Sequence, residues 1–382
     1  MRSWLGEFDR RIVFLTTVLL VLGAVLIHGA SAYVPGAPDP DAVGSLPAHL
    51  MRVGLGVLAC LFASQVDYRT SARYAEFGLL VSVIALLMVS AGTYAFGNEG
   101  IQRWLSIGGV RFQPAELAKI CLVIALPGWI DRDPTRLRSG WRSWAPLVVP
   151  PLVVGALIVA QPNYGTALAL CLVVAIVLFV GGLSMRWVVG GVSFLAAGAW
   201  FAFLHYPKLQ TRFETWVNVF LREQQDLGAG YQSYNAIMGL GNGHWIGVRP
   251  GEGIMRFSFV PESDSDFVFA VAGEQMGFAG SLLVVLAYML LAARALKIAR
   301  AARDGQAYLT AIAIASMIGV YAFLNIGMVS GLIPVMGLPL PFVSWGGTAM
   351  LTNLIAVGVL LNIARNVRRP RRADARWEAV RP

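Results

Sequence analysis

The chain has 382 residues, of which 57% are hydrophobic and only 13% are charged. With repeated apolar runs of about twenty residues, this composition is typical of polytopic membrane proteins and leaves no evident soluble domain. The formal net charge of +9 also occurs in nucleic-acid-binding proteins, but basic residues beside a membrane more often meet anionic headgroups. We therefore expect membrane lipids as partners and no nucleic acid.

Ten apolar runs are long enough to cross a bilayer, which takes about 20 residues per helix. They predict an all-α integral membrane protein with about ten transmembrane helices, in which residues 1–364 form a single polytopic membrane domain. A large extracytoplasmic loop, residues 206–265, separates the seventh and eighth spans, and residues 365–382 form a basic cytoplasmic tail. The predicted spans are 12–33, 50–66, 74–95, 115–130, 144–161, 165–183, 187–205, 267–292, 308–330 and 346–364.

The basic residues set the orientation of these spans. An even number of spans places both termini on one side, and most Lys and Arg residues fall there, including Arg2, Arg10, Arg11 and those of the tail. Because cytoplasmic loops retain Lys and Arg, both termini are predicted to be cytoplasmic, in the plasma (inner) membrane of a bacterium. The first span has no small-residue cleavage site after it and is predicted to be a retained anchor.

The extracytoplasmic stretch FGNEGIQRWLSIGGVRFQPAELAKI, residues 96–120, carries charges into a predicted span. Glu116 and Lys119 lie three positions apart, which permits an ion pair on one helical face. Pro114 in the first turn and a carboxylate near the positive helix end explain Glu116 structurally. They do not explain Lys119, because a cation deeper in an apolar run usually faces a cavity or a partner. We favour a functional Lys119 and leave Glu116 open.

Arginines near the outer surface add to this positive charge. Arg103 and Arg256, together with Lys119, could form a pocket for phosphate, since guanidinium and ammonium groups bind phosphate oxygens strongly. For any one of them, snorkelling towards lipid headgroups explains the sequence equally well. Both interpretations stay open.

Two further stretches depart from a plain helical bundle. Within the large loop, TRFETWVNVFL at 211–221 has the spacing of a helix in the membrane interface, and the glycine-rich segment after it lacks the GKS or GKT of a Walker site. In 325–351, prolines and glycines break the helix where irregular backbone must be buried or face a watery cavity. Ser344 and Thr348 then open the last span, either as helix caps or as ligand contacts.

Three carboxylates crowd the start of the eighth span, in VPESDSDFVFAV at 260–271. Asp266 directly precedes the apolar run, where the helix dipole favours a negative charge. Glu262 and Asp264 are more than one cap requires, and like charges repel each other. Such a cluster also suits a general base or a divalent cation, so capping and catalysis both remain possible from the residues alone.

A family resemblance decides between them. The segments QRWLSIGGVRFQPAELAK, QPNYGT, YQSYNAI, VPESDSDFVFAVAGEQMGF and NIGMVSGLIPVMGLPLPFVSWGGT resemble, in order, the motifs of the SEDS family, the RodA and FtsW peptidoglycan glycosyltransferases. The resemblance covers nearly the whole chain and leans slightly towards RodA. It implies a GT-C-like membrane fold and polymerisation of lipid II, the lipid-linked disaccharide-pentapeptide, into glycan strands on the outer face during cell elongation or division.

The resemblance also implies the site residues. The essential Asp of the family's Pro-Glu-x-x-x-Asp-Phe motif matches Asp266, which would be the catalytic residue and a possible metal ligand. A divalent cation, Mg²⁺ or Mn²⁺, is the implied cofactor, and a class B penicillin-binding transpeptidase is the implied partner. The implied substrate-binding residues are Arg103, Glu116, Lys119, Gln232, Arg256, Glu262 and Ser344.

The chain departs from the family pattern at several motif positions. Asn163 stands where the family usually has Asp, and Asp264 and Ser265 replace a common His and Thr. Arg256 replaces a common Lys, which keeps the charge but changes its geometry, and Ala115 replaces a usual Ser. These changes alter local electrostatics without removing Asp266.

We predict a metal-assisted, inverting glycosyl transfer between a lipid-linked donor strand and a lipid II acceptor. Asp266 would deprotonate the acceptor hydroxyl or help to bind the cation, while Arg103, Lys119 and Arg256 would neutralise the leaving pyrophosphate. Two alternatives remain: a lipid II transporter (flippase), since intramembrane charges also suit transport, and a noncatalytic scaffold of the elongation or division complex. The clustering of polar residues on one side favours the enzyme over the transporter.

Overall fold

The computed structural model describes residues 8–31, 46–95, 103–107, 110–221, 230–248, 253 and 265–368. Ten long helices dominate these residues and match the ten predicted spans in order. They are α1 (Arg10–Ser31), α2 (Leu46–Gln65), α3 (Tyr68–Ala95), α4 (Pro114–Arg132), α5 (Trp141–Ala160), α6 (Tyr164–Val180), α7 (Met185–His205), α10 (Val268–Arg300), α11 (Gly305–Val329) and α12 (Gly347–Arg368).

Shorter elements connect some of the long helices. A 3₁₀ turn, Pro134–Leu137, follows α4, and two three-residue strands, β1 (Leu105–Ile107) and β2 (Val110–Phe112), pair antiparallel before it. The large loop contains α8 (Pro207–Trp216), a π-helical turn (Val217–Leu221) and α9 (Tyr231–Asn242). The predicted interface helix at 211–221 is therefore present, but it begins four residues earlier, at Pro207, which suits the first turn of a helix.

Eight of the described helices are long and apolar enough to cross a membrane, so the chain is a multi-pass membrane protein. The remaining two spans are α6, which has 17 residues, and α4, which carries Glu116, Lys119, Asp131 and Arg132. Nearly all of the side chains of α4 are buried against other helices. A span that is surrounded by protein can hold charged residues that lipid would not accept.

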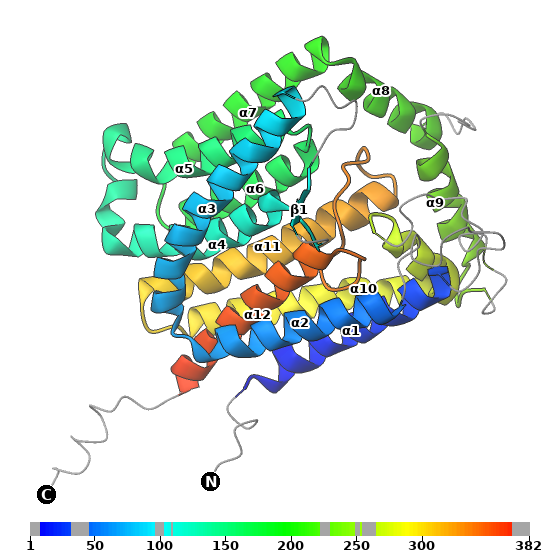
Figure 1. Ribbon diagram of the computed structural model, residues 1–382, viewed down its shortest axis with the longest axis horizontal. Helices are drawn as coiled ribbons and strands as arrows, with labels where there is room; N and C mark the ends of the chain where they lie inside the picture. Colours follow the sequence, from blue (N-terminus) through cyan, green and yellow to red (C-terminus); the bar gives the residue numbers. More distant parts are fainter. Residues whose placement is uncertain are drawn as a thin grey trace, which may run out of the picture.

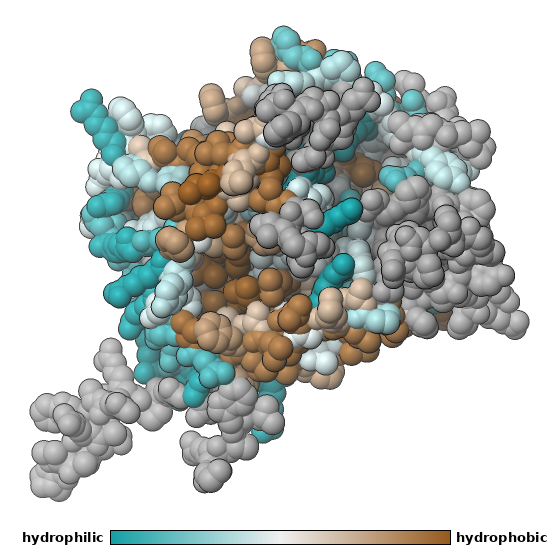
Figure 2. Space-filling view, viewed as in Figure 1, coloured by the Kyte–Doolittle hydropathy of each residue, from teal (hydrophilic) through white to brown (hydrophobic). Residues whose placement is uncertain are grey.

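The bundle is organised around α11. This helix packs against α4, α6, α10 and α12, and α12 in turn packs along α2. The α2–α12 contact is close: a Cβ at Gly358 would lie 2.4 Å from the carbonyl oxygen of Cys60, so only glycine fits there. By contrast, α7 lies at the edge of the bundle, and Figure 2 shows broad apolar surface on the face it draws.

The two ends of the bundle differ. The start of α1 and the end of α12 lie at the same end, whereas α8 and α9 cover the opposite end (Figure 1). The side chain of Arg368, the last residue of α12, pairs with Asp9, just before α1, at 2.7 Å. This arrangement agrees with an even number of spans.

Two features were not predicted from the sequence. One is the antiparallel strand pair, in which Leu105 pairs with Phe112 and Ile107 with Val110. The other is the length of α10, which runs eight residues beyond the predicted end at 292 and changes direction at Gly277, where φ is 65°. The extra turns carry Arg294 and Lys297, charges that the hydropathy pattern places outside the apolar run.

Candidate active site

Asp266 lies at the covered end of the bundle, one residue before the N-cap of α10, which is Phe267. It is partly exposed, whereas the neighbouring Phe267 and Val268 are buried. Asp266 therefore precedes the cap position of the helix, which weakens the purely structural explanation. Glu262, Asp264 and Arg256 lie outside the described residues.

Two buried side chains fix the backbone that carries Asp266. The Asn325 side-chain amide, on α11, donates to the carbonyl oxygen of Asp266 at 2.8 Å and to that of Leu338 at 2.5 Å. The Ser344 hydroxyl donates to the carbonyl oxygen of Ser265 at 2.5 Å and accepts from the backbone N–H of Leu340 at 2.7 Å. Both side chains thus tie the Asp266 segment to the irregular segment 330–346.

The segment 330–346 also leaves room for the carboxylate. Gly337 has a φ of 68°, a conformation that glycine adopts readily, and a Cβ there would lie 3.4 Å from Oδ2 of Asp266. Leu338, Leu340 and Phe342 in the same segment are buried. The prediction that irregular backbone at this depth is covered by protein is confirmed for these residues.

Arg103 approaches the same region from the chain before β1. Its guanidinium donates to the carbonyl oxygen of Pro162 at 2.7 Å, which joins it to the turn between α5 and α6. Burial lowers the pKa of Arg103, the charge of Arg212 on α8 lowers it further, and the carboxylate of Asp266 raises it. Arg212 and Asp266 therefore both act electrostatically on Arg103.

The turn between α5 and α6 packs closely on the irregular segment. A Cβ at Gly165 would lie 2.4 Å from the carbonyl oxygen of Met336. Glycine at this position therefore permits close contact with the segment 330–346 and does more than reverse the chain direction. Asn163 is buried, as is Gln161, whose amide donates to the carbonyl oxygen of Leu86 at 3.1 Å. The residue that replaces the family's usual Asp is thus enclosed beside the site.

Glu116 and Lys119 form the predicted (i, i+3) ion pair, with 2.5 Å between Oε2 and Nζ. Their side chains are only 2% and 1% exposed, so neither reaches solvent directly. The hydroxyl of Thr352, on α12, donates to Glu116 at 3.2 Å, and Nζ of Lys119 lies 4.4 Å from the ring centroid of Tyr321. Direct substrate contact by the pair remains a prediction, whereas its contacts to α11 and α12 are structural.

Helix α11 connects this ion pair with Asp266. Tyr321, which lies over Lys119, and Asn325, which holds the Asp266 backbone, are four residues apart and therefore face the same side of the helix. The two charged groups thus lie against neighbouring turns of one helix. A short link joins α4 and α12 here as well, since the backbone N–H of Gln113 donates to the Thr348 hydroxyl at 3.2 Å.

Helix α9 brings Gln232 to the same end of the bundle and packs on the first half of α10. The glycine-rich stretch after α9 permits this contact, because a Cβ at Gly243 would lie 1.9 Å from the carbonyl oxygen of Gly273. The amide of Asn242 donates to the fully buried Glu274 at 3.0 Å. The glycines here have a packing role.

The described residues supply one carboxylate, that of Asp266, towards the expected divalent cation. No group of three or more His, Cys, Asp or Glu residues that could hold a metal occurs within the described ranges. Mg²⁺ is often bound by one or two carboxylates together with the phosphates of a substrate. Asp266 beside Arg103 fits a cation that arrives with a diphosphate.

Sequence reasoning missed Asn325, Arg212 and Glu274 as residues of this region. An Asn in the middle of an apolar span, and a Glu eight residues after Asp266, are signals of a buried polar contact. Arg212 was noted only as part of an interface helix. None of the three reveals its partner by sequence spacing, because Asn325 and Asp266 are 59 positions apart.

Comparisons with known proteins show the family of this chain. Residues 10–369 match the family of cell cycle proteins that comprises FtsW, RodA and SpoVE. The chain is 34% identical over 360 residues to the peptidoglycan glycosyltransferase MrdB of Escherichia coli K12, covering 91% of this chain and 92% of that one. It is 30% identical over 364 residues to the probable peptidoglycan glycosyltransferase FtsW of Trichlorobacter lovleyi, covering 95% of each.

A solved structure has the same fold. It describes the coordination of polymerization and crosslinking by a peptidoglycan synthase complex, and one of its chains superposes with a TM-score of 0.76 at 27% identity. The match covers 95% of this chain and 99% of that chain.

Proposed function

The chain belongs to the FtsW, RodA and SpoVE family, and we propose that Asp266 is the residue with which it polymerises lipid II. It is a peptidoglycan glycosyltransferase, as its curated relatives are. The observation that carries the assignment is the placement of Asp266: a partly exposed carboxylate, fixed through its backbone by buried Asn325, beside the cation of Arg103. A preorganised carboxylate and cation suit a step that moves a proton and releases an anion.

In the proposed reaction, Asp266 accepts the proton of the acceptor sugar hydroxyl of lipid II. The hydroxyl oxygen then bonds to the anomeric carbon of the donor strand from the face opposite the pyrophosphate, which leaves with its polyprenyl chain. The configuration at the anomeric carbon is inverted. Arg103 stabilises the negative charge that develops on the leaving pyrophosphate.

The buried ion pair has a supporting part in this proposal. Glu116 and Lys119 hold α4 against α11 and α12, the helices that present Asn325 and Thr348. Direct contacts of Lys119, Arg256, Glu262, Gln232 and Ser344 with the substrate remain predictions. A divalent cation bound by Asp266 would add positive charge at the pyrophosphate.

The membrane location follows from the substrates. Both carry polyprenyl chains, which helix surfaces in the bilayer can accommodate while the sugars stay in water. The Arg and Lys residues near the ends of the chain support cytoplasmic termini in the plasma membrane of a bacterium. With the termini on that side, Asp266 would lie on the outer face. The structural relative from a complex that couples polymerization to crosslinking supports a class B penicillin-binding transpeptidase as partner.

The test is polymerisation of purified lipid II by the protein reconstituted with its cognate transpeptidase. We expect glycan strands from the wild type and none from Asp266→Asn, although the variant elutes and unfolds like the wild type. A chelator should stop the wild-type reaction, and Mg²⁺ or Mn²⁺ should restore it. Normal polymerisation by Asp266→Asn would refute the assignment. Movement of lipid II across vesicle membranes without polymer would support a transporter, and neither activity would support a scaffold.

A further inference from the structure

A groove with mixed lining lies between α1 and α10, at the end of the bundle opposite Asp266. Its volume is about 480 Å³, and it is defined here as the α1–α10 groove. One part of its lining is basic and the other is apolar; the principal residues are Arg10, Arg11, Arg294 and Lys297 on the basic side, and Phe14 and Leu290 on the apolar side. A second hollow of about 420 Å³ shares the three arginines and adds Asp9 and Arg368.

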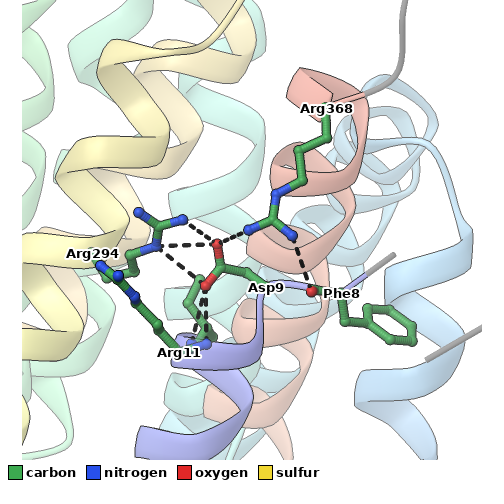
Figure 3. A network of polar contacts seen from close by, with 6 residues as sticks. Phe8, Asp9, Arg11, Arg294 and Arg368 are labelled. Atoms are coloured by element: carbon green, nitrogen blue, oxygen red, sulfur yellow. Dashed lines mark hydrogen bonds and ion pairs between the residues drawn. The ribbon is translucent and has the colours of Figure 1, made fainter. Parts of the chain in front are cut away.

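A built network holds the basic part in place. Asp9, whose side chain is 1% exposed, binds Arg294 through both carboxylate oxygens and binds Arg368 at 2.7 Å (Figure 3). Oδ1 of Asp9 also accepts the backbone N–H groups of Arg11 and Ile12 at 3.2 and 3.3 Å. Arg294 is therefore fixed at the wall of the groove rather than extended into solvent.

The network leaves positive charge unmatched. Within the described ranges, the side chains of Arg10, Arg11 and Lys297 have no ion-pair partner, and the one carboxylate of Asp9 already faces Arg294 and Arg368. A concentration of cations around a hollow attracts an anion, and guanidinium groups bind phosphate oxygens in particular.

The apolar part follows the basic part along the membrane normal. Phe14 lies one helical turn after Arg10 and Arg11, and Leu290 lies two turns before Lys297. Phe14 and Leu290 are 65% and 57% exposed, so they face the surroundings and not the core. In a bilayer, this order would bring the cations near the headgroups and the apolar residues near the acyl chains.

We propose that the α1–α10 groove binds an anionic phospholipid. Arg11, Arg294 and Lys297 contact the phosphate, and an acyl chain lies over Phe14 and Leu290. An uncharged or zwitterionic headgroup fits less well, because a zwitterionic lipid brings its own ammonium group to a cationic site. A free phosphate would leave the apolar part of the groove in contact with nothing.

The experiment measures lipid retention by the purified full-length protein with native mass spectrometry. Phosphatidylglycerol and phosphatidylcholine with identical acyl chains are titrated into detergent-purified protein. We expect saturable retention of one phosphatidylglycerol molecule and no comparable retention of phosphatidylcholine. Inorganic phosphate at the same concentration should not displace the lipid, because it lacks an acyl chain.

Three variants make the measurement specific. Arg11→Gln/Lys297→Gln removes two cations without touching the Asp9 ion pairs, and should weaken phosphatidylglycerol binding by about 30-fold. Ala293→Trp fills the groove at an exposed position while keeping every cation, and should also abolish retention. Arg73→Gln/Arg186→Gln removes two exposed cations from the starts of α3 and α7, at the same end, and should bind like the wild type.

Other outcomes would overturn the proposal. Equal retention by the wild type and all variants would mean that the groove is not the site. Equal loss in the Arg73/Arg186 control would indicate attraction to the whole basic end. Loss in the Arg11/Lys297 variant but full retention by Ala293→Trp would indicate a headgroup contact outside the groove. Each variant is first checked for normal elution and unfolding temperature.

Discussion

Two aspartates lie just before long apolar helices, but at opposite ends of the bundle. Asp9 immediately precedes α1, and Asp266 lies two residues before the start of α10. Asp9 is buried and bound by Arg294, Arg368 and two backbone N–H groups. Asp266 is partly exposed, its backbone carbonyl accepts from Asn325, and Arg103 donates to the carbonyl oxygen of Pro162.

The difference shows two ways in which a fold holds an aspartate before a helix. At Asp9 the guanidinium groups contact the carboxylate itself, which joins α1, α10 and α12. At Asp266 the buried partners Asn325 and Ser344 hold the backbone of residues 265 and 266. Side chains from distant segments therefore position the main chain at Asp266, whereas at Asp9 the carboxylate itself makes the contacts that join the helices.

The largest effect on activity is expected for a substitution of Asp266. Asp266→Asn removes the proposed general base and should lower polymerisation by about 10²- to 10⁴-fold. Because Asp266 is partly exposed and the variant keeps the backbone contact with Asn325, the free energy of unfolding should change by no more than about 1 kcal/mol. Strand synthesis from lipid II and chemical unfolding in detergent measure the two quantities, and a variant that is both inactive and unstable would show a structural role.

The next effect concerns the buried ion pair of Glu116 and Lys119 and the stability of the protein. Lys119→Met leaves the carboxylate of Glu116 uncompensated in a site that is 2% exposed, and should cost about 3 to 5 kcal/mol of stability. The double variant Glu116→Leu/Lys119→Met removes both charges and should recover most of that loss, which unfolding measurements can test. If the double variant is stable but inactive, the charges serve the reaction as well as the packing; if it is stable and active, their role is structural alone.

Features within one helix could be predicted from the sequence, whereas contacts between segments far apart in the sequence could not. The spans and the Glu116–Lys119 pair depend on residues within one helix, so hydropathy and (i, i+3) spacing were sufficient. The contacts that place Asp266 join residues 59 and 79 positions apart, and no periodic pattern connects Asn325 or Ser344 with it. The basic residues at the chain ends predicted topology and contacts with lipid headgroups, but not an ion-pair network, because Asp9 meets Arg294 and Arg368 across almost the whole chain.

A third prediction concerns the structural aspartate. Asp9→Asn should lower the free energy of unfolding by about 2 kcal/mol, because hydrogen bonds between charged groups are lost while Arg294 and Arg368 stay partly exposed. Polymerisation by the folded variant should stay within about twofold of the wild type, since Asp9 and Asp266 lie at opposite ends of the bundle. A loss of activity in fully folded protein would show that the two ends are coupled.

The same carboxylate predicts a pH dependence of stability. Burial raises the pKa of Asp9, but the hydrogen bond and the charge of Arg294 outweigh it, so the pKa lies below its ordinary value of 3.8. A lowered pKa in the folded state contributes stability above pH 3.8 that is lost as the pH falls through the folded value. The stability difference between wild type and Asp9→Asn should therefore be constant from pH 7 to pH 5 and shrink only below about pH 4. A difference that shrinks between pH 7 and pH 5 would show that other groups control it.

The smallest effect is expected for a substitution of Ser344, which contacts the backbone next to Asp266. Ser344→Ala removes the hydroxyl that bonds the Ser265 carbonyl and the Leu340 N–H, and should cost about 1 to 2 kcal/mol. If these contacts orient Asp266, turnover should fall by about tenfold with little change in KM, because small misplacements of a reacting group slow the chemical step. Ser330→Ala is the matched control, since the Ser330 hydroxyl donates to carbonyl oxygens of its own helix, those of Ile326 and Gly327. Equal turnover in the two variants would mean that Ser344 contributes to packing alone. A loss of turnover confined to Ser344→Ala would mean that the contact between Ser344 and the Ser265 backbone positions Asp266.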